Sequence, residues 1–140
     1  MLAVVALVAM VLSVLIGLSL LTGLLRGRRP LPLTVLVHLV VAAIALAAWT
    51  TYVVGDDRAW LAWAVFALLL LINTLGDQLM LQGWRARAVR EGRTVPTGTR
   101  LYLAAARDTL SFARPTAAVH ALLAPVSFFG VLLVALGVGD

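Results

Sequence analysis

The chain has 140 residues, of which 63% are hydrophobic and only 12% are charged. About a quarter of the residues in a water-soluble domain are charged. This composition therefore excludes a water-soluble domain and indicates an integral membrane protein. The absence of cysteine excludes disulfides, thiolate metal sites, iron–sulfur clusters and cysteine nucleophiles. The formal net charge is +5, and in so apolar a chain this excess favours membrane orientation over nucleic-acid binding.

Four uninterrupted apolar stretches are long enough to cross a hydrocarbon core about 30 Å thick, which takes roughly 20 helical residues. They cover residues 1–25, 31–54, 60–81 and 116–138. Because they are continuous rather than alternating, they predict helices and exclude a membrane β-barrel. We therefore expect a single all-α membrane domain over residues 1–140, built as an up-down bundle of four transmembrane helices.

The connection between the third and fourth stretches, residues 82–114, is rich in arginine. Its first half, Gly83 to Gly98, contains Trp84 and Pro96 and predicts a solvated turn. Its second half repeats polar residues at helical spacing and predicts an amphipathic helix lying in the membrane interface before the fourth span. Anchoring to anionic lipid is the favoured role of this helix, and docking of a partner is the alternative.

All eleven basic residues are arginines, and ten of them share one side of the membrane if the N-terminus lies outside. Only Arg58 falls in the short connection on the other side. Since positive residues accumulate in cytoplasmic loops, we expect an N-out, C-out protein of a bacterial plasma membrane. The arginine-rich loop lacks interleaved aromatic residues, so we expect the lipid bilayer, and no nucleic acid, as its partner.

The only two histidines, His38 and His120, lie in the second and fourth stretches. Both are roughly 6 to 10 Å from the cytoplasmic end at 1.5 Å per helical residue. In an up-down bundle the second and fourth helices are diagonal, so we expect the two imidazoles to face each other. Such a pair can supply both axial nitrogens of one haem. The sequence thus favours a b-type haem protein for electron transfer or for haem sensing or handling, without enzymatic turnover of its own.

This arrangement resembles that of membrane b-type cytochromes, whose four-helix bundles carry haem between histidines on alternate helices. The resemblance is one of architecture and implies bound haem b. Those proteins commonly hold two haems on four histidines, whereas this chain has histidines for one. Arg28, Arg29 and Arg114 would lie at the cytoplasmic end, where they could bind the haem propionates.

Asp77, in the third stretch, lies at nearly the same depth as the histidines and opens two alternatives. Together with His38 and His120 it would form a two-histidine, one-carboxylate set, suited to a metal ion or to a small metal- or proton-coupled carrier. Alternatively, Asp77 pairs with a histidine in a structural or assembly subunit of a larger membrane complex. Small-residue faces such as Ser13 with Gly17 leave a homo-oligomer open. Nucleotide-binding and common hydrolase motifs are absent from the sequence.

Overall fold

The computed structural model describes residues 1–26, 31–55, 58–111 and 113–138, and these form helices joined by short connections. The helices are α1 (Leu2–Arg26), α2 (Leu33–Gly55), α3 (Ala59–Arg90), α4 (Gly98–Thr109) and α5 (Pro115–Ala135). All except α4 are long and apolar enough to cross a membrane. The predicted all-helical chain with four apolar helices of spanning length is therefore confirmed.

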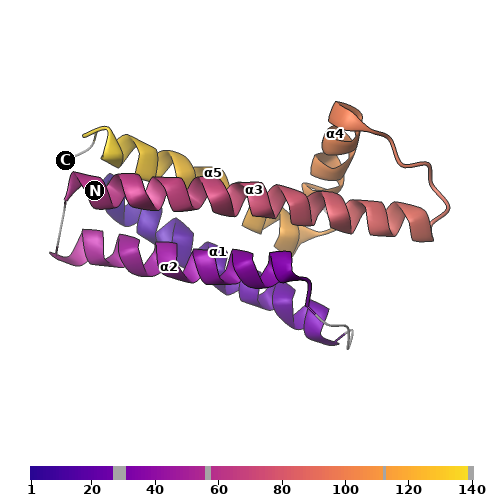
Figure 1. Ribbon diagram of the computed structural model, residues 1–140, viewed down its shortest axis with the longest axis horizontal. Coiled ribbons are helices and arrows are strands. Elements are labelled where there is room, and N and C mark those ends of the chain that lie inside the picture. Colours follow the sequence, from indigo (N-terminus) through magenta and orange to yellow (C-terminus); the bar gives the residue numbers. More distant parts are fainter. Residues whose placement is uncertain (27–30, 56–57, 112, 139–140) are drawn as a thin grey trace.

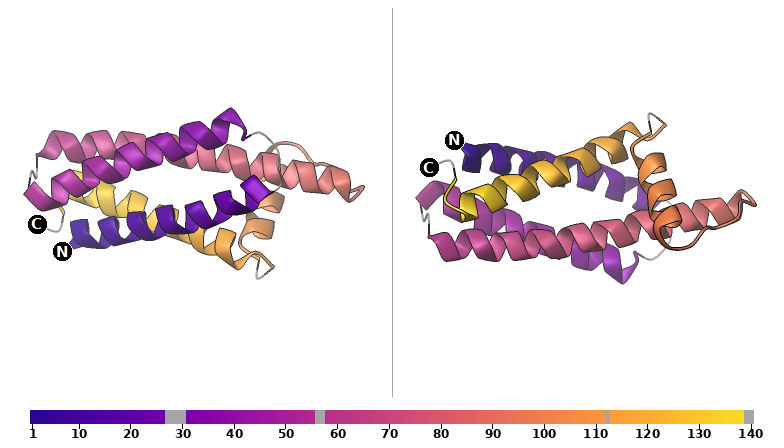
Figure 2. Two further views of the ribbon diagram at one scale, coloured as in Figure 1. Left: turned by 90° about the horizontal axis from the view of Figure 1, so that it is seen from below. Right: turned by 90° about the horizontal axis from the view of Figure 1, so that it is seen from above.

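The four long helices lie lengthwise, and each runs opposite to the one before it along the chain (Figure 1). The most extensive contacts join α1 with α5 and α2 with α3, and Figure 2 shows these pairs as two layers. Smaller contacts join α3 with α5 and α1 with α2. Within the described part of the chain the backbones of α2 and α5 do not come close to each other, so these helices occupy diagonal positions.

The best-packed part of the interior lies toward the end of the bundle that carries the N-terminus. Trp49, Val65 and Val131 are the largest fully buried side chains there. The indole N–H of Trp49 donates a hydrogen bond to the Ala3 carbonyl at 3.1 Å, and its ring stacks on Tyr52 with 4.7 Å between centroids. A buried indole needs such a partner, and this bond joins α2 to α1.

The α1–α5 contact depends on Gly130. A Cβ atom placed on Gly130 would lie only 2.9 Å from the Cβ of Ala6. Carbon atoms attract best at about 3.5–4.0 Å, so only glycine permits this approach of the two helices. The close approach positions α5, and with it His120, against α1.

The third long helix continues to Arg90, well beyond Leu81, where its apolar stretch ends. The prediction of a solvated turn over residues 83–98 is therefore wrong for residues 83–90. The helix persists because Trp84 and Ala88 have a packing partner: they are buried against α4, within a small second core. The chain turns only afterwards, at Gly92, whose φ of 65° suits glycine.

The predicted amphipathic helix is α4, which lies crosswise to the long helices (Figure 1). Its buried side chains, Leu101 and Ala105, face α3. Asp108 near its end accepts a hydrogen bond from Arg87 of α3 at 2.6 Å and lies 3.6 Å from the Nε of Arg114. This carboxylate therefore links α3, α4 and the beginning of α5.

Candidate functional site

The two histidines meet in the interior of the bundle. His38 projects from α2 and His120 from α5, with 6.4 Å between the ring centroids and 61° between the ring planes. Both side chains are partly buried. Because the backbones of α2 and α5 do not come close to each other, the two imidazoles approach across the space between the helix layers. The structure thus brings together the residue pair that the sequence singles out.

His120 is held by α1. Its Nδ1 lies 3.0 Å from the backbone carbonyl oxygen of Ser13. A carbonyl only accepts, so in the neutral ring Nδ1 carries the proton and donates, which leaves Nε2 with a free lone pair. A Cβ placed on Gly17, one turn further along α1, would lie 3.3 Å from the Cε1 of His120. Glycine at this position therefore lets the ring reach the Ser13 carbonyl.

His38 occupies a related position against α3. A Cβ placed on Gly76 would lie 3.7 Å from the Cε1 of His38, which is an ordinary van der Waals distance. The Nδ1 of His38 is buried and makes no hydrogen bond with the described residues, while the backbone of Ile72 lies within hydrogen-bond reach of the same ring. A buried polar atom without a partner is unfavourable by about 1–3 kcal/mol, and a bound ligand at this position would relieve that penalty.

Asp77 is directed toward α4 rather than toward the histidines. The Tyr102 hydroxyl lies 3.5 Å and 3.4 Å from its two carboxylate oxygens. The negative charge of Asp77, together with burial and this hydrogen bond, raises the pKa of Tyr102. Among the described residues no group of three histidine, aspartate or glutamate side chains could hold a metal ion. The structure therefore does not assemble the set of His38, His120 and Asp77.

The arginines predicted to bind propionates are described only in part. Arg114 immediately precedes α5 and lies six residues before His120, roughly 9 Å along a helix. Its side chain is partly exposed and lies near Asp108. Arg28 and Arg29 fall outside the described residues.

Sequence reasoning did not find the two glycines that contact the histidines. Ser13 and Gly17 form a small-residue face in the sequence, but such a face indicates close packing without saying what packs there. Gly76 lies directly before Asp77 and has no side chain of its own that would mark it as part of a site. The available signal was a glycine at about the depth of the histidines on each of the two long helices that lack a histidine, α1 and α3.

Comparison of the chain with protein-family models, with curated proteins and with solved structures gives no match. Similarity therefore assigns neither a family nor an activity. The function has to be argued from the histidine pair and its surroundings.

Proposed function

We propose that the chain binds one haem b between His38 and His120 and serves in electron transfer or in haem sensing or handling within a membrane. The observation that carries this proposal is the 6.4 Å separation of the imidazole centroids. Two metal–nitrogen bonds of about 2 Å each, plus the reach from nitrogen to ring centre, put coordinating rings on opposite sides of one ion about 6 Å apart. Each ring can rotate about its metal bond, so the angle between the ring planes is compatible with this geometry.

The donor atoms of the two histidines suit such a group. The Nδ1–H of His120 donates to the backbone carbonyl of Ser13, and the opposite ring nitrogen, Nε2, stays available, as is usual for metal-bound histidine. The buried Nδ1 of His38 lacks a partner. When bound, haem would supply one-electron redox chemistry. The role of this chain would be to hold the iron through His38 and His120.

The proposal includes an orientation. The protein would be an up-down bundle with both termini outside a bacterial plasma membrane and the arginine-rich end in the cytoplasm. The distribution of the arginines supports this. The crosswise direction of α4 suits a helix lying in the interface (Figure 1). The propionates would then face the end that carries Arg28, Arg29 and Arg114.

The test is an absorption spectrum of the full chain, expressed with ample haem, purified in detergent and measured oxidised and reduced. We expect a Soret band, a shift on reduction and one haem per chain. His38→Ala and His120→Ala should each abolish this spectrum, because each removes one axial nitrogen. Gln78→Ala, which changes an exposed polar residue of α3, is the matched control and should keep it.

A second step separates loss of a ligand from loss of folding. Added imidazole should restore the spectrum of His38→Gly, since it can occupy the space left by the side chain. A folded wild-type protein without a Soret band would contradict the haem proposal. If that colourless protein also co-purified with other subunits, the structural or assembly role would be favoured instead. Bound metal in elemental analysis would favour the carrier, although Asp77 contacts Tyr102 and not the histidines.

A further inference from the structure

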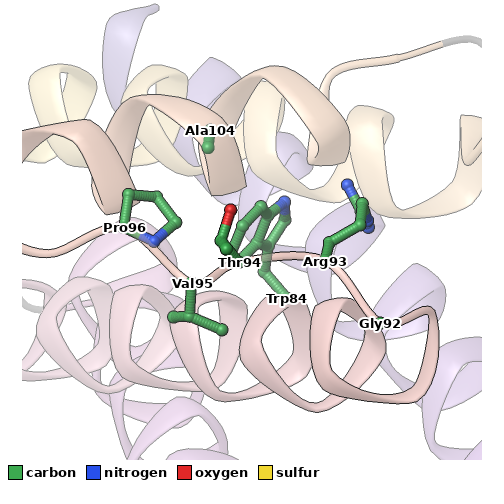
Figure 3. Close-up of a pocket in the computed structure, with 7 residues that line it drawn as sticks. All are labelled: Trp84, Gly92, Arg93, Thr94, Val95, Pro96 and Ala104. Atoms are coloured by element: carbon green, nitrogen blue, oxygen red, sulfur yellow. The ribbon is translucent and has the colours of Figure 1, made fainter.

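A pocket of about 640 Å³ lies outside the four-helix core, between the end of α3, the connection that follows it and α4 (Figure 3). Trp84 lines it from α3 and Ala104 from α4, and the connection contributes Arg93, Thr94 and Pro96. The histidine pair takes no part in this pocket. Any ligand bound here would be independent of the proposed haem.

Three hydrogen-bond donors line the pocket. The guanidinium carbon of Arg93 lies 5.3 Å from the centroid of the Trp84 ring. Figure 3 shows the indole nitrogen of Trp84 on the edge of the ring that faces α4 and Arg93, so its N–H is the second donor. The Thr94 hydroxyl is the third donor. A guanidinium nitrogen of Arg93 also lies 2.7 Å from a carboxylate oxygen of Glu91. Both side chains are about half exposed, so this ion pair is weak.

The surroundings select for negative charge. Residues 85–114 contain seven arginines and only two acidic residues, Glu91 and Asp108. Asp108 is already engaged by Arg87 and lies near Arg114. The pocket therefore lies in a strongly positive region, and a guanidinium beside an N–H and a hydroxyl suits phosphate oxygens.

The position of the pocket along α3 suggests the source of the phosphate. Trp84 follows the end of the apolar stretch at Leu81 by about one helical turn, which is where tryptophan and lipid headgroups meet at a membrane surface. Val95, Pro96 and Ala104 give the pocket an apolar side next to its donors. Free phosphate would gain nothing from that side, whereas the glycerol and first methylenes of a lipid would.

We propose that this pocket binds the headgroup phosphate of an anionic phospholipid, with Arg93, Trp84 and Thr94 as its donors. A zwitterionic lipid such as phosphatidylcholine carries a cation that the neighbouring arginines repel, so the site discriminates against it. Phosphatidylglycerol, which lacks that cation, is the probe of choice.

The test is native mass spectrometry of the full chain in detergent, titrated with phosphatidylglycerol. We expect one lipid to bind more tightly than all others. Arg93→Gln should weaken this binding about tenfold or more, because a charged hydrogen bond to phosphate is lost. The matched control is Arg90→Gln, which removes the same charge from an exposed residue of the last turn of α3 that does not line the pocket. It should weaken binding less than about threefold, through the general field alone.

A second variant protects the test against misfolding. Thr94→Val keeps the shape of the side chain and should weaken binding roughly threefold to tenfold, with an unchanged circular dichroism spectrum. Equal losses in Arg93→Gln and Arg90→Gln would overturn the proposal, as would equal affinities for phosphatidylcholine and phosphatidylglycerol. Displacement of the lipid by inorganic phosphate at an equal concentration would show that the pocket takes the free ion, and the lipid assignment would then be wrong.

Discussion

Replacing Gly130 with alanine tests how the histidine-bearing helix α5 is held against α1. The new methyl group would start 2.9 Å from the Cβ of Ala6, with the Cα of Ala6 at 3.6 Å. Carbon–carbon contacts prefer about 3.5–4.0 Å, so the helices must separate by several tenths of an ångström along their contact. That contact is among the most extensive in the molecule, so the disturbance spreads over many side chains.

The expected effect is a net loss of stability. Overpacking of a well-packed interior is unfavourable by about 1–3 kcal/mol. Alanine gains up to about 1 kcal/mol over glycine through its helix propensity. With that gain subtracted in full, the free energy of unfolding of Gly130→Ala should fall by up to about 2 kcal/mol. Equilibrium unfolding by SDS in mixed micelles, followed by far-ultraviolet circular dichroism, measures this difference.

Two further variants make the explanation specific. The double variant Ala6→Gly with Gly130→Ala moves one methyl group from α1 to α5 and should recover most of the lost stability. Gly23→Ala, at a helical position with no neighbouring atom within 4 Å, should cause no loss. If Gly130→Ala unfolded like Gly23→Ala, or if the methyl exchange recovered nothing, the close helix approach would not be the origin of the α1–α5 contact.

Three other predictions follow from the contacts of the described residues. Gly17→Ala should be less stable than Gly76→Ala by about 1 kcal/mol in the same unfolding assay, because only the former crowds a histidine that hydrogen-bonds to a backbone carbonyl. Equal stabilities would argue against that hydrogen bond. Asp77→Asn should lower the pKa of Tyr102 toward its ordinary value of about 10, since the aspartate charge is the main cause of its raised pKa. Ultraviolet titration of the phenol measures this pKa, and an unchanged midpoint would exclude the contact between Asp77 and Tyr102. Asp108→Asn should increase hydrogen exchange in α4 severalfold, because the lost ion pair, worth about 1 kcal/mol or less, holds this short helix against α3. The long helices should stay protected, since they have extensive contacts of their own, and uniform exchange throughout would contradict this.

The sequence predicted the long helices well because their lengths and apolar content follow directly from the thickness of a bilayer. It failed where tertiary contact replaces hydropathy as the cause of structure. Beyond Leu81 the chain is polar enough to suggest a turn, yet α3 continues because Trp84 and Ala88 gain a partner in α4. That partner lies at a later point in the chain, and its docking cannot be inferred from the composition of either segment alone.

The candidate site, too, could be predicted from the sequence only in part. The approach of His38 and His120 could be anticipated, because depth in a bilayer and diagonal placement both follow from counting residues along the helices. The depths of Gly17 and Gly76 mark them as candidate neighbours, but they do not show which imidazole each glycine contacts. A helix that is apolar all round carries no sequence signal for which face meets which neighbour. The direction of Asp77 toward Tyr102 was hidden for the same reason.

The division of the histidine site between two helix layers determines when during biosynthesis it can form. One layer, α2 with α3, is complete before α5 has been made, and it contains one imidazole and one of the two glycines. The other layer joins the first helix of the chain to the last long one. A ligand that needs both imidazoles must therefore be loaded after translation has passed α5 and the two layers have met, and a shortened chain lacking α5 would have no site to load.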